Sequence, residues 1–339
     1  MLVATSIDYR PLIEPPAKEA VAAFRAAHRG APGYGGSPGA AAIAVAIGML
    51  IALFGVLAAG GTTRWLAIAV GGVVAAFGVA GLVLAARRWP RETRLDAFAR
   101  ANGLLYYPRT GDPGYPGAIF GRGSGRGGSD HLLRTAGRLL DYGNYQYTTG
   151  SGKNRQTHEW WFLAMQLDRA LPHMVLDSKA NDGLFGATSL PVAFARDQVL
   201  HLEGDFDRHF TLYCPREYER DALYVFTPDL MAACIDEAGT LDLELVDRFL
   251  FAYSRGHLDM ADPAVQRRVW RLVDTVGERL LEQSEHYADE NVGGRAAFAA
   301  NVVAPRGARL RRGLNVAGVV ATVVIAAIVL LPRLLGLFQ

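Results

Sequence analysis

The chain contains the sequence AAAIAVAIGMLIALFGVLAAGG (40–61), followed after three residues by WLAIAVGGVVAAFGVAGLVLAA (65–86). Neither run contains a charged residue, and each would be about 33 Å long as an α-helix, enough to cross the hydrocarbon core of a bilayer. Hydrocarbon offers backbone amides no partner, so a helix is the expected state of such runs. Because only Thr62, Thr63 and Arg64 separate them, they predict a tight transmembrane helical hairpin over 40–86.

A third uncharged run lies at 313–331, and its apolar part, LNVAGVVATVVIAAIVLL (314–331), is near the lower length limit for a span. The rest of the chain carries all 35 Lys and Arg and all 33 Asp and Glu. Its charged fraction is therefore about 25%, the ordinary value for a soluble domain. The composition predicts a soluble domain held at a membrane by three helices.

Small residues recur every four positions in each run: Ala44, Gly48 and Ala52, then Ala67, Gly71 and Ala75, then Gly318, Thr322 and Ala326. This spacing lets helices approach closely, so we expect packing within the bundle, in a homo-oligomer or with another membrane protein. No charge inside the runs marks a transport pathway, and we therefore interpret them as an anchor in the lipid bilayer.

The arginines that flank the runs predict the orientation, because basic residues are enriched on the cytoplasmic side. Four follow the second run (Arg87, Arg88, Arg91, Arg94) and four precede the third (Arg306, Arg309, Arg311, Arg312). The hairpin tip carries only Arg64 and the C-terminal tail only Arg333. We expect a multi-pass protein of the bacterial inner (plasma) membrane, with the N-terminus and 87–312 in the cytoplasm and the C-terminus outside.

The predicted domain order is a cytoplasmic tail with a Gly/Pro linker (1–39), the helical hairpin (40–86), a cytoplasmic domain (87–312, core 104–290), and a C-terminal transmembrane helix with a short tail (313–339). Short helices are expected at 17–28 and 91–103. The fold class is α+β with a mostly antiparallel sheet, because strand-like segments follow one another with few helices between them.

Alternating apolar residues predict strands at 138–149, 157–168, 173–178, 198–204, 210–215, 222–227, 241–247 and 249–254. The first two flank GSGKNR and predict a β-hairpin. A helix is expected in TPDLMAACIDEAG, with Thr227 as N-cap, Pro228 in the first turn and Gly239 as the stop. An amphipathic helix is expected at 263–288, with Val265, Val269, Leu272, Val276 and Leu280 on one face.

The predicted cytoplasmic domain is acidic: residues 95–305 hold 21 Lys and Arg against 29 Asp and Glu. An acidic domain is a poor partner for nucleic acid, which we therefore exclude. Cys214 and Cys234 lack metal-site spacing and are expected to be small buried hydrophobic residues.

The run GRGSGRGGSDH (121–131) contains GxGxxG, but no helix is expected after it, so we interpret it as a loop rather than a dinucleotide site. Arg122 and Arg126, with the glycine amides, could still hold an anion. His158 and Glu159 begin like a zinc-protease HExxH helix, but Phe162 stands where the second histidine is required.

One group of side chains could bind a divalent metal. In a continuous strand His201, Glu203, Asp205, Asp207 and His209 would share one face, because alternate residues point the same way. The candidate metal ligands are His201, Glu203, Asp205 and His209. The alternative is a solvated strand face, and the same alternative applies to His173, Asp177 and Asp182.

The segments LPHMVLDS (171–178), YGNYQYTTGSGKNRQTHEWW (142–161) and DFDRHFTLYCPREYERDALYVFTPDLM (205–231) resemble a family of uncharacterised actinobacterial membrane proteins. The resemblance covers about 90–300. It implies a helical-hairpin anchor and a cytoplasmic α+β domain, and it implies no activity, so no catalytic residue is carried over.

The function that the sequence favours is a cytoplasmic binding or scaffolding domain tethered to the inner membrane, because each catalytic motif fails. No cofactor is expected. The alternatives are a membrane-tethered metal-dependent hydrolase using the 201–209 face and, third, an accessory subunit of a transporter.

Overall fold

The computed structural model describes residues 6–34, 39–57, 60–182, 188–202, 204–292 and 301–313. The chain divides into two compact units, Met1–Arg109 and Thr110–Gln339. The predicted third span lies outside the described residues except for Gly313, so that span remains a prediction.

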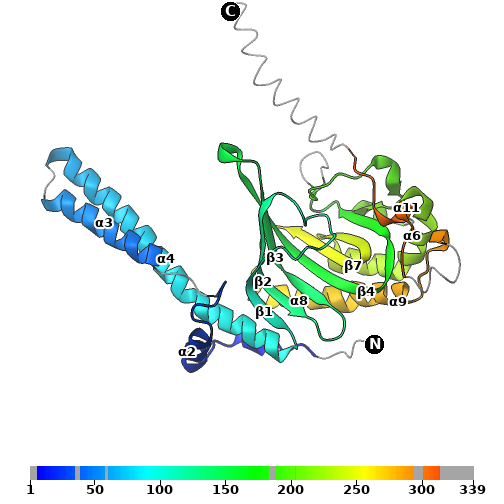
Figure 1. The fold of residues 1–339 in the computed structure, drawn as a ribbon, viewed down its shortest axis with the longest axis horizontal. Helices are drawn as coiled ribbons and strands as arrows, with labels where there is room; N and C mark the ends of the chain where they lie inside the picture. Colours follow the sequence, from blue (N-terminus) through cyan, green and yellow to red (C-terminus); the bar gives the residue numbers. More distant parts are fainter. Residues whose placement is uncertain are drawn as a thin grey trace, which may run out of the picture. The chain divides into compact units, whose positions relative to one another are not determined.

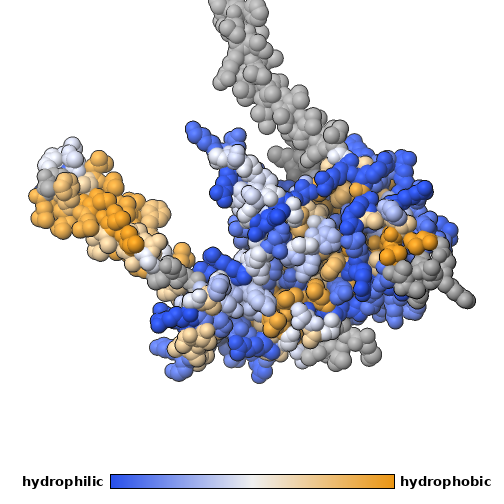
Figure 2. Space-filling view, viewed as in Figure 1, coloured by the Kyte–Doolittle hydropathy of each residue, from blue (hydrophilic) through white to orange (hydrophobic). Residues whose placement is uncertain are grey.

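The first unit is mainly helical (Figure 1). Its elements are α1 (Arg10–Ile13), α2 (Lys18–Ala27), α3 (Gly39–Leu57) and α4 (Gly61–Ala101), with β1 (Leu105–Thr110) at its end. Helices α3 and α4 are long and apolar enough to cross a membrane, and apolar side chains cover α3 and the part of α4 beside it in Figure 2. They match the predicted helical hairpin and indicate membrane association. The helix expected at 91–103 is the end of α4, which continues through Pro90.

Glycine allows α3 and α4 to approach closely. A Cβ on Gly48 would lie 2.4 Å from the backbone nitrogen of Ala75, and one on Gly71 would lie 2.5 Å from that of Ala52. These residues belong to the small-residue pattern seen in the sequence. Any larger side chain at Gly48 or Gly71 would separate the helices, so the pattern is used within the hairpin.

The second unit contains an antiparallel sheet with the strand order β2-β3-β4-β6-β5, and β7 pairs with β4. Its strands are β2 (Ser124–Arg134), β3 (Leu140–Thr149), β4 (Gln156–Ser178), β5 (Val199–Leu200), β6 (Phe210–Tyr213) and β7 (Asp242–Arg255). Its α-helices in the described residues are α5 (Phe206–His209), α6 (Glu219–Val225), α7 (Pro228–Ala238), α8 (Pro263–Leu272), α9 (Glu278–Glu285) and α11 (Pro305–Ala308). The α+β class with a mostly antiparallel sheet is therefore confirmed.

The predicted hairpin around GSGKNR is formed by β3 and β4, in register from Leu140 opposite Met165 to Thr149 opposite Gln156. Two strands are longer than expected. The segments 157–168 and 173–178 join in β4, and 241–247 and 249–254 join in β7, where Asp247 takes φ +53°. The β4–β7 pairing is irregular between Gln166 and Met174, so a local bend interrupts the alternation without ending either strand.

A loop was expected over the glycine-rich run 121–131. Most of this run instead forms a strand, because β2 begins at Ser124. A Cβ on Gly128 would lie 1.9 Å from Nε2 of the buried His131, so a missing side chain makes room for the imidazole. Glycine is uncommon in β-strands, but here tertiary packing overrides that tendency.

Helix α7 matches its prediction: Thr227 Oγ1 accepts a hydrogen bond from the Leu230 amide, and Gly239 is the C-cap. The strand expected at 222–227 is wrong, because 222–225 belongs to α6 and Thr227 caps α7. Ala222 and Val225 are buried whereas Leu223 and Tyr224 are exposed, a helical rather than alternating pattern.

The amphipathic helix expected at 263–288 is formed by α8 and α9, joined by a π-helical turn at Val273–Gly277. Its predicted apolar face is buried at Val269, Leu272, Val276 and Leu280. Helix α9 packs against β4 (Figure 1). Cys214 and Cys234 are buried free thiols, as expected, and burial raises the pKa of each to about 12.

We predict that Gly71→Val destabilises the α3–α4 hairpin by about 1–3 kcal/mol, because the added side chain meets the backbone of α3. Gly72→Val is the matched control, since nothing lies within 4 Å of a Cβ at Gly72. Thermal unfolding of the full chain in detergent micelles, followed by far-UV circular dichroism, measures the difference. Equal melting temperatures for the two variants would contradict the packing described.

Candidate functional site

The predicted metal ligands do not share a strand face. Strand β5 ends at Leu200, the chain turns at Gly204 with φ +78°, and His209 ends the short helix α5. The side chain of His201 is 81% exposed, and its Nδ1 lies 2.6 Å from Asp207 Oδ2. The expected continuous strand over 201–209 is therefore wrong, because the glycine turn and the helix redirect the side chains.

Asp205 is the N-cap residue of α5, and Glu203 lies outside the described residues. Within the part of the chain that the structure describes, no group of three or more His, Cys, Asp or Glu side chains is placed to hold a metal ion. The metal site at His201, Glu203, Asp205 and His209 stays a prediction.

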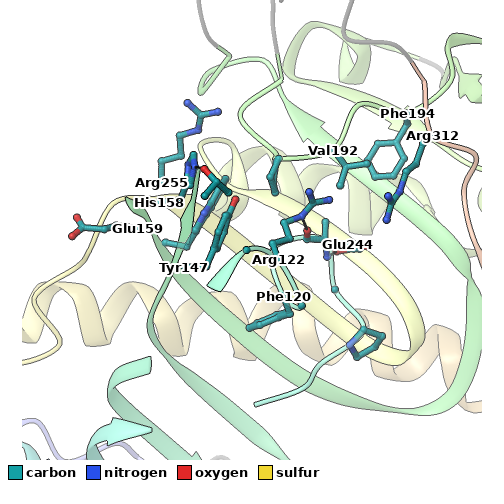
Figure 3. Close-up of a pocket in the computed structure, with 18 of the residues that line it drawn as sticks. Phe120, Arg122, Tyr147, His158, Glu159, Val192, Phe194, Glu244, Arg255 and Arg312 are labelled. Carbon is teal, nitrogen blue, oxygen red and sulfur yellow. Dashed lines mark hydrogen bonds between the residues drawn. The ribbon is translucent and has the colours of Figure 1, made fainter. Parts of the chain in front are cut away.

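A pocket of about 1050 Å³ lies in the second unit (Figure 3). Its walls come from segments that are far apart in the sequence: 116–123, the ends of β3 and β4 at the hairpin, 191–194, β7 and 309–312. Binding pockets for small molecules commonly occupy about 300–1,000 Å³, so this space is large enough for one.

A buried hydrogen-bond network forms one side of the pocket. His173 Nε2 lies 2.8 Å from Glu244 Oε1, and both side chains are buried. Glu244 Oε2 accepts hydrogen bonds from the Ala118 amide at 2.7 Å and from the Tyr253 hydroxyl at 2.8 Å. Burial raises the pKa of Tyr253 well above its usual value, which keeps the hydroxyl a donor. Each carboxylate oxygen of Glu244 therefore has a donor.

A hydrogen bond from a backbone amide determines the tautomer of His173. The Leu310 amide donates a hydrogen bond to His173 Nδ1 at 2.9 Å, so this nitrogen must present its lone pair. The proton consequently resides on Nε2 and is donated to Glu244. The network thus ties the segment that leads into the predicted third span to the centre of the sheet.

Two arginines point into the pocket from opposite walls, Arg122 and Arg312 (Figure 3). Arg122 donates its Nε proton to the Ala118 carbonyl at 2.6 Å, which directs the rest of the guanidinium into the pocket. Burial lowers the pKa of Arg122, the charge of Arg312 lowers it further, and Tyr147 and Glu244 act in the opposite direction. The pocket therefore brings two guanidinium groups and one buried carboxylate into the same space.

The other two lining arginines are already engaged. Arg309 forms a bidentate ion pair with Asp247, at 2.7 and 2.8 Å. Arg255 donates to the Ser189 carbonyl and lies over the ring of Trp160, 5.8 Å from its centroid. Glu159 also lines the pocket, but its carboxylate points away from Arg122 and Arg312 (Figure 3).

Aromatic side chains form the apolar part of the wall. Phe120, Tyr147, Trp160 and Phe194 belong to the main hydrophobic cluster of this unit and line the pocket. Trp160 is 3% exposed, and its indole interacts with the side chain of Tyr147. The pocket thus combines cations with an apolar surface.

The sequence pointed to part of this site. Arg122 lines the pocket, and its anion contact stays a prediction, whereas Arg126 forms an ion pair with Asp112 at 2.8 Å. Glu244 and Arg312 were not singled out. The signal for Glu244 in LDLELVD was weak, because the leucines at 241, 243 and 245 share the opposite strand face and only Val246 is an apolar neighbour on its own face.

A second group of polar side chains lies where β4 pairs with β7 in the sheet. Asp177 and Asp242 are both buried, and the protonated Asp177 carboxyl donates a hydrogen bond to Asp242. Thr188 donates to Asp177 Oδ1 at 2.7 Å. Burial and the charge of Asp242 raise the pKa of Asp177 to about 7. The pair is stable in this form because one proton is shared between two carboxyls.

The comparisons with known proteins give a distant structural likeness. No family model matches the sequence, and no curated protein matches it. Among solved structures, the chain is similar to the mycobacterial trehalose monomycolate transport factor A, TtfA, with 9% sequence identity and a TM-score of 0.38. The similarity covers 56% of this chain and 94% of that chain. Values this low establish no shared function.

We predict that Glu244→Gln destabilises the second unit by about 2–3 kcal/mol, because the amide cannot accept all three buried hydrogen bonds. Glu159→Gln is the control, since Glu159 lines the same pocket but is exposed, and it should change stability by less than about 0.5 kcal/mol. Denaturant unfolding followed by tryptophan fluorescence measures both. A Glu244→Gln variant as stable as the wild type would rule out the network as a stabilising element.

The Asp177–Asp242 pair predicts that stability falls as pH rises. The folded chain keeps a proton on Asp177 up to about pH 7, whereas the unfolded chain releases it near 3.8. Its contribution is complete below pH 3.8 and is lost as pH rises toward 7. Asp177→Asn, which keeps the donor, should flatten the decline between about pH 4 and pH 7 in thermal unfolding. Asp236→Asn, at an exposed carboxyl of α7, should leave the decline unchanged.

Proposed function

We propose that this protein is a membrane-tethered binding module whose second unit binds an anionic ligand in the pocket between Arg122 and Arg312. The observation that carries the proposal is the convergence of these two guanidinium groups. Two like charges in a partly desolvated pocket are unfavourable without a counter-ion, and a guanidinium pairs well with phosphate or carboxylate oxygens.

The Glu244 carboxylate also lines the pocket and offsets part of the positive charge, but its oxygens are not hydrogen-bonded to the arginines. Glu244 already accepts hydrogen bonds from His173, Ala118 and Tyr253. The terminal nitrogens of Arg122 therefore have donors left for a ligand. Aromatic rings beside the arginines favour a ligand that carries an apolar part as well as its anionic group.

The tether is the second part of the proposal. Helices α3 and α4 have the length and composition of membrane spans. Arg312 precedes the predicted third span by one residue, so the pocket would lie close to the surface of the membrane that this span enters. The arginine flanks favour a multi-pass inner-membrane protein with 87–312 in the cytoplasm and the C-terminus outside. No group of described residues favours the metal-dependent hydrolase or the transporter subunit over this function.

The test is calorimetric titration of the full chain in detergent micelles with inorganic phosphate, pyrophosphate and citrate as probes. We expect at least one anion to bind and to lose about 10-fold or more in affinity in Arg122→Gln and in Arg312→Gln, because each variant removes a charge-assisted hydrogen bond. Arg309→Gln is the matched control, since Arg309 lines the same pocket but is paired with Asp247. We expect it to change affinity by less than about threefold.

Two results would overturn the proposal. One is equal affinity in the wild type and in Arg122→Gln and Arg312→Gln, and the other is an equal loss in all three variants, which would indicate only a general charge effect.

A further inference from the structure

A second pocket, of about 630 Å³, lies in the first unit between α2 and α4. One wall is formed by the face of α2 that carries Lys18 and Arg25, together with Arg29 just after the helix. The other wall is the part of α4 from Ala86 to Pro90. Lys18 and Arg25 are seven residues apart and share one face of α2, and Arg29 follows the end of the helix.

Aromatic packing holds α2 beside α4. Phe24 is buried, and its ring meets Trp89 edge-on at a centroid distance of 6.2 Å. His28 and Tyr34 stack at 4.2 Å and both contact Phe24. This cluster anchors one side of α2, and the basic side faces the pocket. The pocket is therefore a consequence of stable packing between two helices.

The pocket is positively charged and contains one aromatic face. Lys18, Arg25 and Arg29 are exposed, and the Arg25 guanidinium lies over the ring of Trp89, 6.0 Å from its centroid. No Asp or Glu is among the described residues that line the pocket. One turn further along α4, Glu92 is buried and paired with Arg88 at 3.3 Å. The three cations are thus available to an external anion.

The pocket lies where the apolar part of α4 ends. Ala86 is the last residue of the uncharged run 65–86, and Trp89 follows three residues later. Tryptophan favours the headgroup level of a bilayer, and basic residues beside a span attract anionic lipids. If α4 crosses the bilayer as proposed, the pocket faces the headgroup layer.

We infer that this pocket binds the phosphate group of an anionic phospholipid. The arginine forks would pair with the phosphate oxygens, and the Trp89 ring would lie at the boundary with the acyl chains. The chemistry is that of a phosphate anion, and its source is the membrane rather than free phosphate, because the pocket is at the end of the apolar run. This inference needs the membrane anchor but not the pocket of the second unit.

The test uses the full chain in nanodiscs that contain phosphatidylglycerol and phosphatidylcholine. Native mass spectrometry measures how many phosphatidylglycerol molecules remain bound after the disc is removed. We expect the wild type to retain phosphatidylglycerol in preference to phosphatidylcholine. The triple variant Lys18→Gln, Arg25→Gln, Arg29→Gln should lose this preference, by roughly fivefold for each charge removed.

A matched triple variant is available in the second unit. Lys153→Gln, Arg208→Gln, Arg220→Gln removes one lysine and two arginines from exposed positions and should retain phosphatidylglycerol like the wild type. Arg25→Lys with Arg29→Lys keeps the charges and should retain most of the binding, which separates a charge effect from misfolding of α2. Two outcomes would overturn the inference: retention by the Lys18, Arg25 and Arg29 variant equal to that of the wild type, or displacement of the lipid by millimolar inorganic phosphate.

Discussion

The carboxylate of Glu244 is buried at the centre of the second unit, and the surrounding architecture depends on satisfying it. An ionised carboxylate away from water is stable only when its oxygens accept hydrogen bonds. The donors come from β4, from β7 and from the segment before β2, and the imidazole of His173 extends the network to the Leu310 amide. One buried charge therefore fixes four segments relative to one another.

The pocket is a consequence of this arrangement. Ala118 and Leu310 both bond to the network, and Arg122 and Arg312 follow them by a few residues. The same hydrogen bonds that stabilise the buried carboxylate therefore bring the two guanidinium groups to opposite walls of one space. In the first unit, aromatic packing around Phe24 has a similar effect, because it places the basic side of α2 against α4. In both units, apolar or buried polar contacts position the cations that line a pocket.

Much of the fold was predictable where a short segment carries its own physical signal. The apolar runs became α3 and α4, and the cap at Thr227 marked the start of α7, because these signals depend on neighbours in the sequence. The expectation failed where distant contacts decided the conformation. The glycine-rich run before His131 became a strand because β3 pairs with it, and 222–225 became part of a helix in which Ala222 and Val225 are buried whereas Leu223 and Tyr224 are exposed.

The sequence by itself determined the apolar hairpin, the antiparallel α+β domain and the basic flanks, because charge, hydrophobic period and helix caps act over a few residues. The tertiary structure alone decided which charges meet. Arg122 and Arg312 are 190 positions apart, and no local pattern relates them. They share a pocket because a buried carboxylate needs donors from distant segments, whereas His201 and His209, only eight positions apart, diverge because a glycine turn and a short helix lie between them.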